Sequence, residues 1–164
     1  MNLSILPLTP SVRSFDNPTR ADGLLWLLVG PGSASVDFSR ATRLRDVSFL
    51  CGRLGAEWVS MALRTVTPSH RNLQQISLSV PHVPYDTTLD LANPADVRRA
   101  IGEVIYEQWL ELDRVLVQLS ESHSIRPKVL YYASAGKDEG LRSWVGSLLP
   151  ETTRGSADLV NQRW

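Results

Sequence analysis

Three stretches of the chain predict strands, two because hydrophobic residues recur at every second position and the third because an apolar run follows Pro127. The stretches are residues 45–51, 75–80 and 128–132. In the first of them Val47, Phe49 and Cys51 share one face, a period of two that is typical of a strand with one buried side. An earlier apolar run, residues 24–29, predicts a buried strand or a short core helix. Its six residues are too few to cross a membrane, which takes about 20.

Apolar residues three and four positions apart predict helices elsewhere in the chain. Residues 57–66 form one amphipathic pattern, and residues 141–148 form another that ends before Pro150. We also expect a short helical turn at residues 158–160. The chain therefore alternates predicted strands with predicted helices, which is the pattern of an α/β fold.

The strongest helical pattern runs from Asn93 to Glu121. Asn93 is the predicted N-cap, Pro94 the first helical residue and Asp96 the capping-box partner. A continuous helix of this length would span about 42 Å, which is about the width of a domain of this size. We therefore expect the helix to lie along the whole domain or to break, with Gly102 as the weakest point.

The length and the distribution of prolines indicate one domain behind an irregular segment. A chain of 164 residues suits a single domain. Residues 1–22 hold three prolines among Ser, Thr, Asn and Asp, so an irregular N-terminal segment is predicted there. We accordingly place a single α/β repeat-like domain at residues 23–164.

Two of the predicted strands belong to a sequence repeat. The apolar positions of the two copies are 29 residues apart and read Leu44-x-x-Val47-x-Phe49 and Leu73-x-x-Ile76-x-Leu78. This spacing, with a helix between the copies, is typical of leucine-rich repeats, in which neighbouring strand–helix units stack because one unit cannot bury its apolar face alone. The next strand does not keep the period, so residues 81–124 are predicted to form an irregular unit with an elongated helix. A small α/β fold without such repeats remains the alternative.

Several segments of the chain resemble a recurring unit of fungal F-box and leucine-rich-repeat proteins. They are residues 36–49, 72–78, 109–116, 122–129 and 148–151. The resemblance implies short, irregular leucine-rich-repeat-like units that receive a protein substrate. Members of these families usually carry an N-terminal F-box that docks a ubiquitin-ligase adaptor, and residues 1–35 contain no plausible F-box. The resemblance therefore implies a C-terminal repeat segment, and it leaves a ubiquitin-ligase role in doubt.

Charge and composition exclude several classes of function. The chain carries 17 basic and 17 acidic residues, so binding to nucleic acid or to a membrane surface through bulk charge is not expected. A single cysteine, Cys51, excludes an intrachain disulfide, and three scattered histidines argue against a metal site. We expect Cys51 to be a buried packing residue and the histidines to lie at surface or turn positions. No cofactor is predicted, and an intracellular location, cytoplasmic or nuclear, is expected.

Outward-facing strand residues are the first candidates for a binding surface. They are Ser48, Ser77, Ser79, Lys128 and Tyr132. A second candidate is a negative stripe on the long helix, formed by Glu103, Glu107 and Glu111 at intervals of four, which is either a solvated face or a docking surface for an Arg-rich partner or for the chain's own arginines. Trp109 is expected in the core, whereas Trp144 and Trp164 are candidates for exposed anchors.

These features predict a non-enzymatic protein–protein interaction module of leucine-rich-repeat type, with a protein as its partner. One alternative is a small α/β enzyme or ligand-binding domain, which would need a concave pocket with convergent polar groups. Another is a truncated product without a function of its own. A curved array of parallel strands with helices outside favours the first interpretation, and a closed sheet around a polar pocket favours an enzyme.

Overall fold

The computed structural model describes residues 24–29, 36–51, 55–80, 90–131, 138–155 and 157–161. The predicted irregular segment 1–22 lies outside these residues, as do Tyr132 and Trp164. The statements below concern the described residues.

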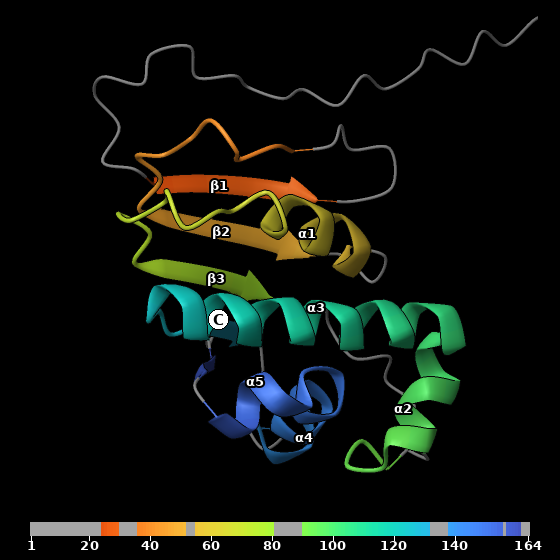
Figure 1. Ribbon diagram of the computed structural model, residues 1–164. Coiled ribbons are helices and arrows are strands. Elements are labelled where there is room, and N and C mark those ends of the chain that lie inside the picture. The colour runs from red at the N-terminus through yellow and green to blue at the C-terminus, as the bar shows by residue number, and fades with distance from the viewer. Residues whose placement is uncertain are drawn as a thin grey trace, which may run out of the picture.

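The chain forms an α/β fold with one parallel sheet (Figure 1). The elements in chain order are β1 (Leu24–Val29), β2 (Asp46–Cys51), α1 (Ala56–Leu63), β3 (Gln75–Ser79), α2 (Pro94–Ile101), α3 (Glu103–His123), β4 (Lys128–Tyr131), α4 (Asp138–Leu148), α5 (Pro150–Gly155) and β5 (Asp158–Asn161). The sheet order is β1-β2-β3-β4-β5, and every neighbouring pair is parallel. The predicted α/β class and the strands at 45–51 and 75–80 are confirmed, the strand expected at 128–132 is confirmed over its described residues 128–131, and the run at 24–29 is a strand. The helical turn expected at residues 158–160 is wrong, because these residues pair with β4 as a strand.

The helices lie on one face of the sheet. Figure 1 shows α1 and α3 side by side in front of the strands. Phe49, Leu78 and Val129 are in register across β2, β3 and β4, and all three belong to a single buried cluster. The same cluster contains Leu63 of α1, Leu116 of α3 and Leu148 of α4. One face of the sheet and the inner sides of the helices therefore form one core.

The 29-residue repeat of the sequence is also a repeat of the backbone. In the sheet, Val47 lies beside Ile76 and Phe49 beside Leu78, so equivalent positions of the two copies are neighbours. The turns before the two strands repeat as well. The backbone bonds Ala41 N to Phe38 O and Leu44 N to Ala41 O recur 29 residues later as His70 N to Thr67 O and Leu73 N to His70 O. Residues 36–51 and 65–80 are thus two stacked copies of one local structure.

A buried histidine joins the two copies. His70 is fully buried, its Nδ1 accepts from Thr67 N at 3.0 Å, and its Nε2 lies 2.7 Å from Phe38 O. Because Nδ1 accepts the Thr67 N–H, the ring proton lies on Nε2 and is donated to the Phe38 carbonyl. His123 repeats this contact one unit further, with Nε2 3.1 Å from Thr67 O, the position equivalent to Phe38. His70 lies in a turn, one of the two positions expected for the histidines, and its buried ring links two stacked turns.

The irregular third unit begins with a helix that breaks at the expected residue. Asn93 caps α2 by accepting from Ala95 N at 3.0 Å, and Pro94 is the first helical residue. Gly102 then separates α2 from α3 with φ of 90°, a conformation that glycine adopts without strain. The capping-box prediction for Asp96 is wrong, because its carboxylate accepts from Asp90 N instead of Asn93 N. The break lets α3, which is 21 residues long, run along the domain while α2 turns away from it (Figure 1).

A buried carboxylate holds the end of the third unit together. Asp113 of α3 is 2% exposed, and its two oxygens accept from Glu151 N at 2.9 Å and from Thr152 N at 2.8 Å. These amides belong to the first turn of α5, which has no partners for them within the helix. Asp113 therefore caps α5 from another helix. This role was not predicted, although an acid one residue from Leu112 in the apolar stripe was a signal for a buried polar contact.

Candidate functional site

The alternation of side chains gives the sheet a second face, opposite the helices. Its described side chains are Asp46, Ser48, Leu50, Gln75, Ser77, Ser79, Lys128, Leu130, Asp158 and Val160, and we call this set the open face. Leu130 is buried but lies outside the core cluster, which agrees with its position on this side. No described helix covers the open face.

Register arranges the open face in two rows that cross the sheet, beside a shorter row formed by Asp46 and Gln75. One row is polar and crosses the sheet through Ser48, Ser77, Lys128 and Asp158. The other row is mostly apolar and crosses through Leu50, Ser79, Leu130 and Val160. Leu50 is 46% exposed, more than any other apolar side chain described on the open face.

The expectation that three serines line an accessible surface is wrong. Ser48, Ser77 and Ser79 are only 5%, 8% and 5% exposed. Their side chains are short and lie between larger neighbours in the sheet. The Gln75 side chain reaches over Ser77 and donates from Nε2 to its Oγ at 3.1 Å, and Ser79 lies in register between Leu50 and Leu130. The serines therefore form the floor of the open face rather than its contact surface.

The accessible part of the open face comes from longer side chains. Leu50 and Asp158 are exposed, while Asp46, Gln75 and Lys128 are partly exposed. Lys128 is thus the predicted strand residue that reaches solvent, and the predicted residue Tyr132 lies outside the described residues. Leu50 was not among the predicted binding residues, although the alternation with Phe49 and Cys51 puts it on the same face as Ser48.

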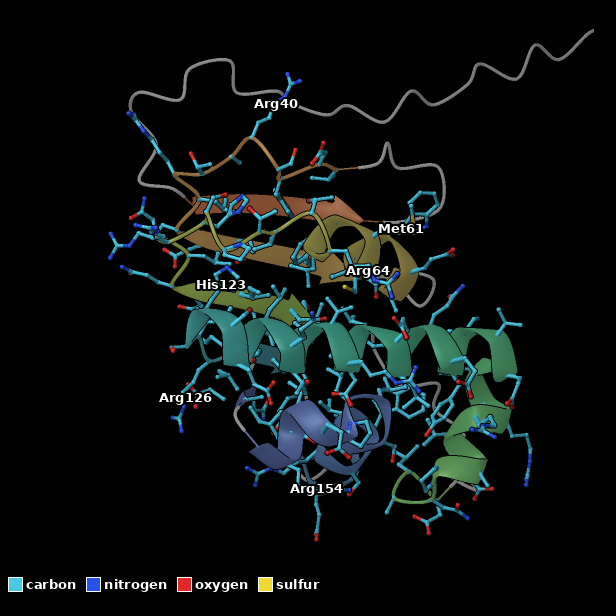
Figure 2. All side chains as sticks on the ribbon, in the orientation of Figure 1. Arg40, Met61, Arg64, His123, Arg126 and Arg154 are labelled. Carbon is cyan, nitrogen blue, oxygen red and sulfur yellow. The ribbon has the colours of Figure 1, made fainter. Side chains whose placement is uncertain are left out.

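The negative stripe on α3 is paired with the chain's own arginines. Arg98 lies 3.3 Å from both Glu103 and Glu107, and its guanidinium also lies over the Tyr106 ring. Glu111 pairs with Arg64, and also with Arg114 at 2.9 Å. Figure 2 shows Arg64 between α1 and α3. Of the two docking partners expected for this stripe, these contacts favour the chain's own arginines, so the stripe presents little net charge.

Potential catalytic groups in the described residues are buried or occupied. Cys51 is 4% exposed, as expected of a packing residue, and burial raises the pKa of its thiol far above the usual range. The thiol therefore stays protonated and unreactive. Both ring nitrogens of His70 are bonded, and His123 contacts Ser122 Oγ and Thr67 O. In the described ranges, no three His, Cys, Asp or Glu side chains are grouped so that they could hold a metal ion.

The tryptophans pack more deeply than predicted. Trp109 is 1% exposed and lies in the core, as expected. Trp144 is 2% exposed and also belongs to the core cluster, so its expected role as an exposed anchor is wrong. Its indole Nε1 has no hydrogen-bond partner among the described residues, which is the cost of burying the ring in the core.

Comparisons with known proteins give no match: no family model fits the sequence, no curated protein is similar to it, and no solved structure resembles it. Among the described helices, none combines the length and the apolar character that a membrane crossing requires. The function must therefore be argued from the geometry alone.

Proposed function

We propose that this chain is a non-enzymatic protein-interaction module with leucine-rich-repeat-like units, and that it binds a protein partner with the open face of its sheet. The observation that carries the proposal is the one-sided covering of the sheet. Parallel strands follow one another in chain order, and their helices cover one face. The other face presents its longer side chains, Leu50 and Asp158 most of all, to solvent above a floor of buried serines. Stacked strand–helix units of this kind characteristically use the uncovered strand face for binding.

The topology supports this proposal over an enzyme of the doubly wound type. In open α/β sheets that bind small molecules, the ligand sits where the strand order reverses and helices change face. The order β1-β2-β3-β4-β5 contains no reversal. Cys51 is buried in the core, and His70 is bonded at both nitrogens. The Ser122 hydroxyl lies 2.8 Å from His123 Nδ1, but the other nitrogen of that ring contacts the Thr67 carbonyl instead of a carboxylate that would orient a base.

The backbone repeat supports the leucine-rich-repeat-like part of the proposal. Two units stack at an interval of 29 residues, and α3 covers the irregular unit that follows. The resemblance of several segments to fungal F-box and leucine-rich-repeat proteins is consistent with such units. By analogy with those proteins, the partner is a substrate protein that the repeats receive on the open face.

Two equally exposed apolar residues on opposite sides of the molecule provide the test. Leu50 on the open face is 46% exposed, and Met61 on the outer side of α1 is 45% exposed (Figure 2). Affinity purification from the native cell is carried out with the wild-type chain, with Leu50→Asp and with Met61→Asp. Circular dichroism melts check that both variants fold, which is expected because neither side chain is in the core.

The proposal expects a protein partner that the wild-type chain and Met61→Asp retain and that Leu50→Asp loses. A charge at Leu50, the most exposed apolar position among the described side chains of the open face, must be desolvated when a partner covers it. A partner that all three chains capture equally, or that Met61→Asp alone loses, would contradict the open face as the binding surface.

A further inference from the structure

Ten of the eleven arginines in the described residues fall into two groups, and the eleventh, the exposed Arg142 of α4, belongs to neither. The first group forms ion pairs within the chain and consists of Arg64, Arg98, Arg99, Arg114, Arg126 and Arg154. All but Arg126 lie on the helices or at their ends, where Glu and Asp side chains face them. Their charges are therefore already balanced by neighbours.

The second group lies in the two stacked turn segments, residues 36–45 and 65–74. These segments carry Arg40, Arg43, Arg45 and Arg71, which we call the basic turns. All four side chains are exposed, and within the described residues none forms an ion pair with a carboxylate. Figure 2 shows Arg40 pointing away from the body of the protein. In a chain of zero net charge, these turns are a local excess of positive charge.

The one carboxylate of the two turn segments does not cancel this excess. Asp37 Oδ1 accepts from Ser39 N at 2.8 Å. The hydrogen bonds from the backbone and the side chain of Ser39, together with the nearby charge of Arg40, lower the pKa of Asp37. Asp37 is therefore ionised at neutral pH but is turned toward its own loop, and three further arginines remain without a counter-charge.

Stacking brings the basic turns of the two units together. The sheet pairs residues 29 positions apart from Asp46 and Gln75 onward, and the turns before them have equivalent backbone bonds. We therefore infer that Arg43 lies near Asn72, and Arg71 near Thr42. The Arg45 Nε donates to Gln74 Oε1 at 2.8 Å, which fixes that guanidinium across the same two turns. Adjacent turns are then about 4.8 Å apart, the spacing of neighbouring strands. A chain laid across the turns could therefore reach the arginines of both units.

We propose that the basic turns dock an acidic segment of a protein partner. Guanidinium forks match carboxylates in a bidentate way, and exposed arginines without internal partners are available for this contact. Single-stranded nucleic acid is disfavoured, because such sites pair basic grooves with exposed aromatic rings. The exposed large hydrophobic residues of the described ranges are Leu50, Met61 and Val104, and none of them is aromatic. The proposal concerns the turns and stands independently of the open face.

The test measures binding of a fluorescent peptide of about twelve residues, alternating Glu and Ser, by anisotropy at low salt. The wild-type chain is compared with the double variant R43E/R71E and with the control R142E. Arg142 is an exposed arginine of α4 without an ion pair to a described residue, so it matches the tested arginines in charge and exposure. A second double variant, R43Q/R71Q, removes the charge without reversing it and covers the case in which R43E/R71E does not fold.

The proposal expects R43E/R71E to weaken peptide binding by about tenfold or more, R43Q/R71Q by several-fold and R142E by less than about twofold. Binding should also fall from low to physiological salt. Equal binding by R43E/R71E and R142E would overturn the proposal. Tighter binding of a single-stranded RNA oligonucleotide than of the acidic peptide would overturn it in favour of a nucleic-acid site.

Discussion

Two neighbouring residues of β2 have opposite surroundings. Phe49 is 1% exposed, contacts the Phe38 ring edge-on and lies in register with Leu78 in the core. Leu50, the next residue, is 46% exposed and points to the open face. Both side chains are large and apolar, so composition does not distinguish them. The comparison teaches that the covering of only one face of the sheet decides which apolar residues stabilise the fold and which are free for a partner.

Substitution at Phe49 tests whether the covered face stabilises the fold, and it should lower the free energy of unfolding more than any other substitution considered below. Phe49→Ala removes a buried ring and leaves a cavity between β2 and the turn segment 36–45, which holds Phe38. The free energy of unfolding should fall by about 3–5 kcal/mol. Leu50→Ala should change the free energy of unfolding by no more than about 0.5 kcal/mol. Urea unfolding followed by circular dichroism measures both values. Similar losses at the two positions would mean that the open face is covered.

Substitution of Asp113, on the helix-covered side of the sheet, should cause the next largest loss of stability. Asp113→Ala leaves two amides in the first turn of α5 without acceptors, which should cost about 2–3 kcal/mol. Asp113→Asn keeps one acceptor oxygen and should lose less. The same urea unfolding measurement checks both variants. An alanine variant as stable as the wild-type chain would show that the contact to α5 does not hold the third unit.

Of the two histidines that link stacked turns, the more buried one should stabilise the fold more, just as Phe49 should stabilise it more than Leu50. His70→Ala removes a fully buried ring and its hydrogen bonds to Phe38 and Thr67, at an expected cost of about 2 kcal/mol. His123→Ala removes an equivalent bond from a half-buried ring and should cost less than about 1 kcal/mol. Thermal melts of the two variants compare them directly. An equal shift of both melting temperatures would contradict the assigned difference in burial.

The paired stripe on α3 should show the smallest effect on stability. Glu111→Gln weakens the contacts with Arg64 and Arg114, and exposed ion pairs of this kind contribute less than about 1 kcal/mol each. The loss should shrink further when the urea unfolding is repeated at high salt. A loss above about 2 kcal/mol would show that this stripe stabilises the packing of α1 on α3.

The regular part of the fold follows from local sequence patterns. The period of two in residues 45–51 and 75–80 predicted strands because alternate side chains point to opposite faces. The 29-residue repeat predicted that Val47 and Ile76 are equivalent, and the register puts them side by side. The break at Gly102 followed from the poor helix propensity of glycine.

The sequence failed where burial depends on neighbours that are distant in the chain. The alternation assigned Ser48, Ser77 and Ser79 to the outward face correctly, but it carries no information on the larger side chains that cover them. Strand β5 has only four residues, too few to show a period, and it forms because β4 offers it an edge. Trp144 lay one position off the apolar stripe of its helix, yet the ring is large enough to reach the core.

Protection of the open face by a bound partner tests the central proposal most directly. Leu50→Cys and Met61→Cys place one reactive thiol on each side of the molecule, while the native Cys51 stays unreactive because it is buried and its pKa is raised. Maleimide labelling rates are measured for both variants, alone and with the partner that the wild-type chain captures. The account predicts that the partner slows labelling at position 50 and leaves position 61 unchanged. Equal rates at position 50 with and without partner, or protection at position 61 alone, would contradict it.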